Sequence, residues 1–226
     1  MLWYDPTYLI MIPAIIFALI ADSMVKSNFS KYSKEASAKG VTGADAARAI
    51  LNENGLYNVG IEAISGELTD HYDPTANVIR LSQSVYGSTS IAAIGVAAHE
   101  AGHAVQHSHE YAPIKARMAV IPISKIGSSL SMPLVLLGLF FSFKPLITAG
   151  IFAFTAVVLL QLITLPVEFN ASSRAIKALD NQGILFPEEL GKAKKVLSAA
   201  AMTYVAAMLS SLLTLLRLIL LSRRRK

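Results

Sequence analysis

The chain has 226 residues, which is enough for one ordinary domain or for a compact domain with a few membrane spans. Hydrophobic residues make up 54% of it and charged residues only 15%, with a mean hydropathy of +0.51, whereas a typical soluble domain carries about 25% charged residues. This composition argues against a purely soluble globule. The absence of cysteine also excludes disulfides, iron-sulfur clusters and thiolate zinc sites, so any metal must bind through His, Asp or Glu.

Four apolar segments are candidates for membrane helices, because about 20 mainly apolar residues span the hydrocarbon core. Residues 146–167 and 196–216 contain no charged residue. Residues 8–25 contain only Asp22, and residues 118–143 contain one lysine and two prolines that could kink a helix. The first segment lacks the basic start and the small-residue cleavage site of a secretory signal, so we interpret it as a retained anchor.

Residues 26–117 form the one sizeable polar stretch, and their pattern is typical of a small α+β domain. Thr42 and Gly55 have the positions of an N-cap and a stop signal for a helix over residues 44–54. Residues 59–64 and 77–82 are expected to be short strands, with a turn at Asp73-Pro74 between them. A second helix of this stretch, rich in alanine, is predicted to begin after the capping residues 88–90 and to continue to about residue 108.

This alanine-rich helix contains His99-Glu100-Ala101-Gly102-His103, the HExxH pattern. Two imidazoles at i and i+4 lie on one face of a helix about one turn apart, which suits a single tetrahedral zinc ion. Glu100, at the adjacent position, is the candidate general base and acid for peptide hydrolysis. The motif stands in an otherwise apolar run, where imidazole and carboxylate groups without partners would be costly to bury. The pattern therefore predicts a metal site.

Catalytic zinc commonly has three protein ligands, and three residues compete for the third position. His107 lies on the same helical face, but about 12 Å from His99 along the axis, too far to share a zinc ion. His109 has the offset found in metzincins, although Gln106 stands where those enzymes have a helix-breaking glycine. Glu168, directly after the third apolar segment, is the remaining candidate.

Several longer stretches resemble a known family, the bacterial neutral zinc metallopeptidases of the YugP type. The resemblance covers nearly the whole chain, and it rests on four pieces: DHYDP (70–74), VIRLS (78–82), AAHEAGHAVQH (97–107) and PVEFNASSRA (166–175). More distantly, the chain is similar to the HtpX and CAAX-prenyl protease group of gluzincins. This similarity implies Glu168 as the third zinc ligand. It also implies a zincin-like fold for residues 26–117.

The chain departs from those distant relatives at Ser172, where they carry an aspartate that orients a ligand histidine. Ser172 or Asn170 could replace it through a hydrogen bond, and the choice between them stays open. His71 and Arg174 are weaker candidates for contacts with substrate or with a site carboxylate. By analogy with zincins, the strand at residues 77–82 is expected to be an edge strand able to bind an extended peptide.

The resulting prediction is an α-helical membrane protein with about four transmembrane helices and a small α+β zincin-like catalytic domain. Residues 1–25 are the anchor, residues 26–117 the catalytic region, and residues 118–226 the remaining spans together with the third-ligand helix at about 168–194. The predicted partners are a protein or peptide substrate and the lipid bilayer, because the basic residues lie beside apolar stretches rather than in a nucleic-acid groove. Zn²⁺ is the expected metal, although Mn or Co would also suit the ligands.

The side of the membrane follows from the distribution of basic residues. If all four segments cross, thirteen Lys and Arg residues lie on the side of the HExxH motif and five on the side of the termini, namely Lys144 and residues 223–226. This bias favours a cytoplasmic active site in a bacterial cell membrane. A non-catalytic metal-binding membrane protein or scaffold is the alternative function, but mere metal storage would not need a carboxylate such as Glu100 beside the ligands. The absence of nucleophile-elbow, P-loop or Rossmann patterns argues against other enzyme types.

Overall fold

The computed structural model of the chain describes residues 6–223, which form two compact units. The first, here called the helical unit, comprises described residues 6–21, 112–166 and 202–223. The second, here called the mixed unit, comprises residues 22–111 and 167–201. The predicted anchor's first five residues and the basic residues 224–226 lie outside the described part. In chain order the elements are η1 (Pro6–Met11), α1 (Ile12–Tyr32), α2 (Gly43–Glu53), β1 (Gly60–Ile64), β2 (His71–Asp73), β3 (Val78–Ser82), α3 (Gln83–Tyr86), α4 (Ile91–Ser108), α5 (Ala112–Phe140), α6 (Lys144–Asn181) and α7 (Pro187–Arg223).

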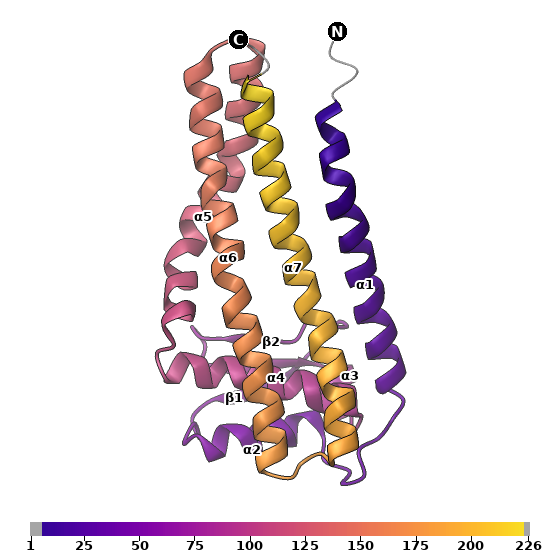
Figure 1. The fold of residues 1–226 in the computed structure, drawn as a ribbon. Helices are drawn as coiled ribbons and strands as arrows, with labels where there is room; N and C mark the ends of the chain where they lie inside the picture. The colour runs from indigo at the N-terminus through magenta and orange to yellow at the C-terminus, as the bar shows by residue number, and fades with distance from the viewer. Residues whose placement is uncertain (1–5, 224–226) are drawn as a thin grey trace. The chain divides into compact units, whose positions relative to one another are not determined.

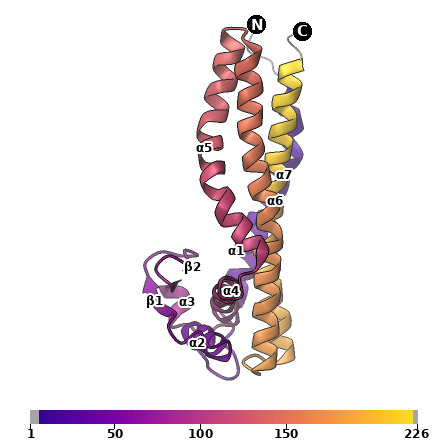
Figure 2. The same ribbon diagram turned by 90° about the vertical axis from the view of Figure 1, so that its left-hand side faces the viewer.

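Small residues let the helices of the helical unit approach closely. In this unit α5, α6 and α7 run side by side (Figures 1 and 2). A Cβ atom at Gly127 of α5 would lie 2.4 Å from the carbonyl oxygen of Ala153 on α6, and one at Gly150 of α6 would lie 2.7 Å from that of Ser131. From Ser124 onward the buried residues of α5 recur every three or four positions, as expected for one helical face. They are Ile114, Ser124, Gly127, Ser131, Val135 and Gly138. Such small-residue seams are typical of helix pairs in membranes.

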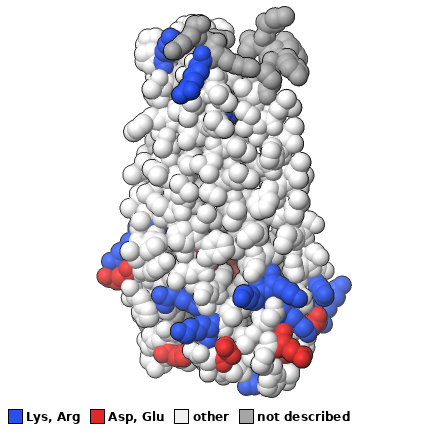
Figure 3. All heavy atoms as spheres, viewed as in Figure 1, with Lys and Arg blue, Asp and Glu red and all other residues white. Residues whose placement is uncertain are grey.

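The outer faces of these helices are apolar. Leu19, Ile126, Phe140 and Phe152 are 66%, 63%, 81% and 80% exposed. No described residue of the helical unit is Asp or Glu, and the surface of its helices in Figure 3 is largely free of charge. Exposed apolar surface of this extent is characteristic of a site that contacts lipid or a partner.

Among the described residues, four helices are long and apolar enough to cross a membrane. They contain the first, third and fourth predicted segments and most of the second. They are Thr7–Tyr32, Ala112–Phe140, Lys144–Asn181 and Pro187–Arg223. The second segment was predicted to reach residue 143, but its helix ends at Phe140 and a turn follows. Pro122 and Pro133, the two prolines that could kink this segment, lie inside helix α5.

The mixed unit contains a three-stranded sheet with the order β1-β3-β2. β1 pairs with β3 in parallel, with Gly60 opposite Val78, and β2 pairs with β3 antiparallel, with His71 opposite Arg80. The prediction that the strand at residues 77–82 forms an edge is therefore wrong, because β3 is the central strand. β2, in the segment predicted as a turn, is an edge strand instead. Strand order depends on contacts between distant segments, which the local pattern of β3 does not encode.

Helix caps in the mixed unit lie where the sequence predicted them. Thr42 forms a capping box with Asp45 at the start of α2, and Gly55 follows the helix with a positive φ of 72°. The hydroxyl of Ser90 accepts a hydrogen bond from the backbone N–H of Ala93 at the start of α4. The core of this unit packs the sheet and α2 against the alanine-rich helix α4, in which Ala97, Ala98 and Ala101 are fully buried. Alanine keeps α4 thin enough to be surrounded on most sides, which fixes the direction of the HExxH side chains.

Candidate metal centre

The two histidines of the HExxH motif face each other on α4. Their Nε2 atoms are 3.1 Å apart, and their rings meet edge to face with centroids 4.6 Å apart. The side chains are 15% and 12% exposed for His99 and His103, so the pair is largely shielded from solvent. This is the arrangement expected from an i, i+4 pair on one helical face.

Glu168 of α6 brings a carboxylate to the same point. Its Oε2 atom lies 3.3 Å from Nε2 of His99 and 3.5 Å from Nε2 of His103, and the residue is only 2% exposed. The three ligand atoms form a triangle with edges of 3.1, 3.3 and 3.5 Å. Donors about 2.0–2.1 Å from a tetrahedral zinc ion lie about 3.3–3.4 Å apart, so the triangle has the size of one face of such a site.

The donor set also fits zinc chemically. Two imidazole nitrogens and one carboxylate oxygen are a common ligand set of catalytic zinc, and they leave a fourth position open. His99, His103 and Glu168 are the group of potential metal ligands found among the described residues. His107 and His109, which competed for the third position on sequence grounds, are not part of that group.

A glycine within the motif allows Glu168 to reach the histidines. A Cβ atom at Gly102 of α4 would lie 2.7 Å from the carbonyl oxygen of Ala171 on α6, closer than side chains tolerate. Ala171 and Ala175 of α6 are themselves fully buried. Small residues on both helices therefore bring the α6 backbone against α4 one turn away from Glu168.

Ser172 contacts the imidazole of His99 on the side opposite to Nε2. Its Oγ atom is 3.1 Å from Nδ1 of His99. Because Nε2 of His99 faces Glu168, this contact lets Nδ1 donate its proton to the serine and leaves Nε2 with its lone pair. A hydrogen bond of this kind fixes the tautomer and the orientation of a metal-binding histidine.

Gln106 contacts the imidazole of His103 in the way that Ser172 contacts that of His99. Its Oε1 atom is 3.0 Å from Nδ1 of His103, and its Nε2 atom donates to the carbonyl oxygen of Val167 at 2.8 Å and to Oδ1 of Asn170 at 2.9 Å. Nε of Arg174 donates to the same Asn170 oxygen at 2.8 Å. Both residues between which the sequence left a choice thus contact the ligand histidines: Ser172 directly, and Asn170 through Gln106.

Sequence reasoning missed Gln106 as a partner of the site. The residue is fully buried, and a buried glutamine normally has hydrogen-bond partners. The available signal was its spacing, three residues after His103 on the buried face of an apolar helix. Its amide satisfies three groups at once, which explains why a polar side chain is retained there.

The ionisation of His103 reflects its neighbours. Burial acts to lower its pKa, but the hydrogen bond to Glu168 and the charges of Glu100 and Glu168 outweigh burial, so the pKa is raised above its ordinary value. Zinc binds the neutral imidazole, so protons and the metal compete for this residue.

Glu100 lies beside the ligands and faces the sheet. The side chain is buried, and its Oε2 atom accepts a hydrogen bond of 2.9 Å from the backbone N–H of Tyr72 on β2. Near it, Asp70 accepts hydrogen bonds from the backbone N–H and hydroxyl of Ser82. Burial raises the pKa of Asp70, and the charge of Glu100 adds to that effect. Glu100, the residue after His99 on α4, thus has its carboxylate held at the edge strand β2.

The weaker sequence candidates lie around this centre. His71 is exposed, and its Nδ1 atom is 2.8 Å from the carbonyl oxygen of Thr69. The ring of His107 meets that of Tyr72 with centroids 6.0 Å apart. Arg174 lies over the ring of Tyr111 at 6.0 Å in addition to its bond with Asn170.

Comparison with known proteins gives two findings. Residues 7–223 match the model of a family described as "Putative neutral zinc metallopeptidase". The chain is also 49% identical over 210 residues to "Putative membrane protease YugP" of Bacillus subtilis (strain 168), covering 93% of each protein. No solved structure was found to match the chain.

The fold and the site thus define the class: a mainly helical protein with four candidate membrane helices and a potential His-His-Glu metal centre. The chain belongs to the neutral zinc metallopeptidase family, and the resemblance noted from its motifs is confirmed.

Proposed function

We propose that this protein is an integral membrane zinc metallopeptidase that hydrolyses peptide bonds. The observation that carries the proposal is the triangle of His99, His103 and Glu168, whose edges of 3.1–3.5 Å suit one face of a tetrahedral zinc site. Membership of a zinc metallopeptidase family and similarity to a membrane protease support it.

Each residue of the centre has a role that its contacts support. Nε2 of both histidines and Oε2 of Glu168 hold the metal, while Ser172 and Gln106 orient the two imidazoles through their Nδ1 atoms. Bound zinc supplies Lewis acidity, polarising a carbonyl and lowering the pKa of water. Glu100 takes the proton of the attacking water on its carboxylate and gives it to the leaving amine. The hydrogen bond from Tyr72 holds that carboxylate in place between the two transfers.

The mixed unit supplies a zincin-like framework for this chemistry. The HExxH helix α4 contacts the sheet through the edge strand β2. An extended peptide would lie beside the edge strand β2, next to the Glu100 carboxylate that accepts the backbone N–H of Tyr72. His71, exposed on this strand, is the side chain best placed to contact such a substrate.

The membrane location rests on four helices with apolar outer faces. The charge distribution favours a cytoplasmic active site, and the chain offers a direct test because it has no cysteine. Single cysteines at Ser142, in the turn between α5 and α6, and at Ser65, after β1, can be labelled in intact bacterial cells with a membrane-impermeant maleimide. We expect labelling of the Ser142→Cys variant alone. Labelling of the Ser65→Cys variant alone would place the active site outside the cytoplasm.

The deciding experiment measures peptidase turnover by the detergent-purified, zinc-loaded chain on an unstructured protein substrate. Glu100→Gln keeps the metal ligands and removes the proton acceptor, so turnover should fall by about 10²–10⁴-fold while zinc content stays unchanged. Glu67→Gln, at an exposed carboxylate, is the matched control and should keep full turnover. Equal turnover in the wild type and Glu100→Gln would contradict the proposal, and bound zinc without turnover in the wild type would favour the non-catalytic scaffold.

A further inference from the structure

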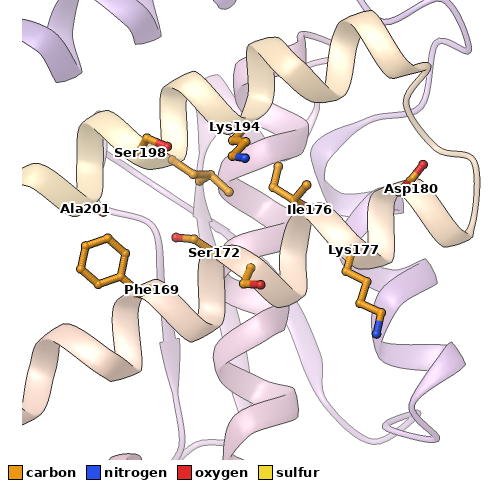
Figure 4. A pocket seen from close by; sticks show the side chains of 10 residues that line it. Phe169, Ser172, Ile176, Lys177, Asp180, Lys194, Ser198 and Ala201 are labelled. Atoms are coloured by element: carbon orange, nitrogen blue, oxygen red, sulfur yellow. The ribbon is translucent and has the colours of Figure 1, made fainter.

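A cavity lies between α6 and α7, apart from the proposed substrate side of the metal centre. It has a volume of about 400 Å³, within the usual range for small-ligand pockets. Figure 4 shows Ser172, Ile176, Lys194 and Ser198 between the two helices, with the end of the Lys177 side chain directed away from Lys194. Its lining consists of Phe169, Ser172, Ser173, Ile176, Lys177, Asp180, Lys194, Leu197, Ser198 and Ala201.

The lining changes from apolar to cationic along the helices. On α6, Phe169 stands two residues after the uncharged run 146–167, and Lys177 lies eight residues further, about 12 Å along the axis. On α7 the order is reversed: Lys194 precedes the uncharged run 196–216, and Ala201 lies inside it. The apolar end of the cavity is therefore continuous with the candidate membrane spans, and the lysines lie where those spans give way to polar sequence.

The two lysines are available to an anion. Both are exposed, and neither forms a hydrogen bond or ion pair within residues 6–223. Asp180 is the one acidic residue of the lining, against two lysines. Ser173 and Ser198, also exposed, add hydroxyl donors between the cationic and apolar ends.

The cavity is separate from the reacting face of the metal centre. It reaches the centre only through Ser172, which contacts Nδ1 of His99, whereas Nε2 of His99 faces Glu168. A molecule in the cavity would lie behind the imidazole and would leave the open metal position free. This arrangement argues against a substrate subsite.

We propose that this cavity binds a membrane phospholipid. The phosphate lies at the end of the cavity that Lys177 and Lys194 line, the serine hydroxyls contact the glycerol region, and the acyl chains leave over Phe169 and Leu197 along the apolar spans. Basic residues between helices at the end of membrane spans are suited to lipid headgroups in this way. The inference rests on the membrane location given under the proposed function, and it does not depend on peptidase activity.

The test measures binding of phosphatidylglycerol to the delipidated, detergent-purified full chain by native mass spectrometry. Each lysine contributes about fivefold to affinity near a lipid phosphate, so K177Q/K194Q should bind about 25-fold more weakly. Lys195→Gln, at the neighbouring exposed lysine outside the cavity, is the matched charge control and should bind like the wild type. Ser198→Trp fills the cavity without changing charge and should also lose the lipid.

Equal lipid binding by the wild type, K177Q/K194Q and Ser198→Trp would overturn the proposal, as would a Lys195→Gln loss equal to that of the double variant. Displacement of the lipid by inorganic phosphate at the same concentration would also overturn it, because it would indicate a site for free phosphate without acyl chains. Zinc content and peptidase turnover are measured on the same samples. A wild-type protein that binds the lipid but has no peptidase turnover would count against the peptidase function alone. A wild-type protein found in the soluble fraction without detergent would count against the membrane location.

Discussion

The two units of this chain solve the packing problem in different ways. In the mixed unit, large aliphatic side chains such as Ile50, Leu51 and Ile79 are fully buried, and all described carboxylates of the protein lie in this unit. In the helical unit, large side chains such as Phe140 and Phe152 face outward, and small residues are buried. Water drives large apolar groups inward, whereas lipid leaves helix association to close backbone packing.

Both units nevertheless use glycine to bring α6 against a neighbouring helix. Gly127 allows contact with α5 in the helical unit, and Gly102 allows contact with α4 in the mixed unit. The same device has a different consequence in each place. In the helical unit it builds a helix pair, while in the mixed unit it delivers the Glu168 carboxylate to two histidines.

The largest effect in this comparison is expected from Glu168→Gln, which leaves both units packed and removes one negative ligand. Loss of groups that only orient zinc ligands lowers affinity by about 10–100-fold, so loss of a ligand itself should exceed that range. The measurement is competition for zinc with a chromophoric chelator, with Glu67→Gln as the control. Unchanged affinity in Glu168→Gln would show that the third ligand is another group.

Gly102→Ala and Gly127→Ala test whether the two contacts of α6 act independently. Each added methyl would meet a carbonyl oxygen, at 2.7 and 2.4 Å, and overpacking of this kind costs about 1–3 kcal/mol. We expect zinc affinity to fall in Gly102→Ala, and the thermal unfolding temperature to fall in Gly127→Ala with zinc affinity unchanged.

Gly191→Ala is the matched control for both variants, because it lies in helix α7 with nothing within 4 Å of an added Cβ. It should raise stability slightly, by up to about 1 kcal/mol. Equal loss of zinc affinity in Gly102→Ala and Gly127→Ala would mean that strain passes along α6 from one unit to the other.

Local signals predicted much of the fold. Capping residues placed α2 and α4, and hydropathy found the four long helices. Hydropathy did not find where those helices end. α6 continues fourteen residues beyond the predicted end of the span at residue 167, because Ala171, Ala175 and Leu179 are buried within the core of the mixed unit. The third-ligand helix predicted at about 168–194 is therefore divided between the end of α6 and the start of α7. The order of the strands likewise depends on pairing between segments distant in sequence, and it was predicted wrongly for β3.

The candidate site also combines features that local spacing predicts with features that depend on contacts between distant segments. The spacing of His99 and His103 is local to one helix, so the sequence alone placed the two imidazoles together. Glu168 is 65 residues beyond His103, so no helical spacing pointed to it; elimination of His107 by distance left it as a candidate, and the resemblance to a family favoured it. The link from Gln106 to Asn170 joins two helices, and no periodicity in either helix reveals it.

Ser172→Ala tests the orienting contact on His99. Removing the hydroxyl 3.1 Å from Nδ1 should lower zinc affinity by about 10–100-fold, since the imidazole loses the bond that fixes its tautomer. Ser173→Ala, at the next residue and exposed, is the matched control and should leave affinity unchanged. A loss in Ser173→Ala equal to that in Ser172→Ala would point to a general disturbance of α6, and Ser172→Thr should restore part of the affinity because it keeps the hydroxyl.

The smallest effect is expected at the sheet, where Asp73 accepts hydrogen bonds from Arg80 at 2.7 Å and from the backbone N–H groups of Thr75 and Ala76. The bond from Arg80 lowers the pKa of Asp73 below its ordinary value of 3.8. A carboxyl with a lowered pKa in the folded state stabilises the fold above the ordinary pKa and loses that contribution as pH falls through the folded value. Asp73→Asn should therefore unfold at a slightly lower temperature than the wild type at pH 7, and the difference should shrink below about pH 4. Because both proteins carry the same metal centre, thermal unfolding of the two at each pH isolates the contribution of Asp73, and a difference that grows on acidification would contradict the assignment.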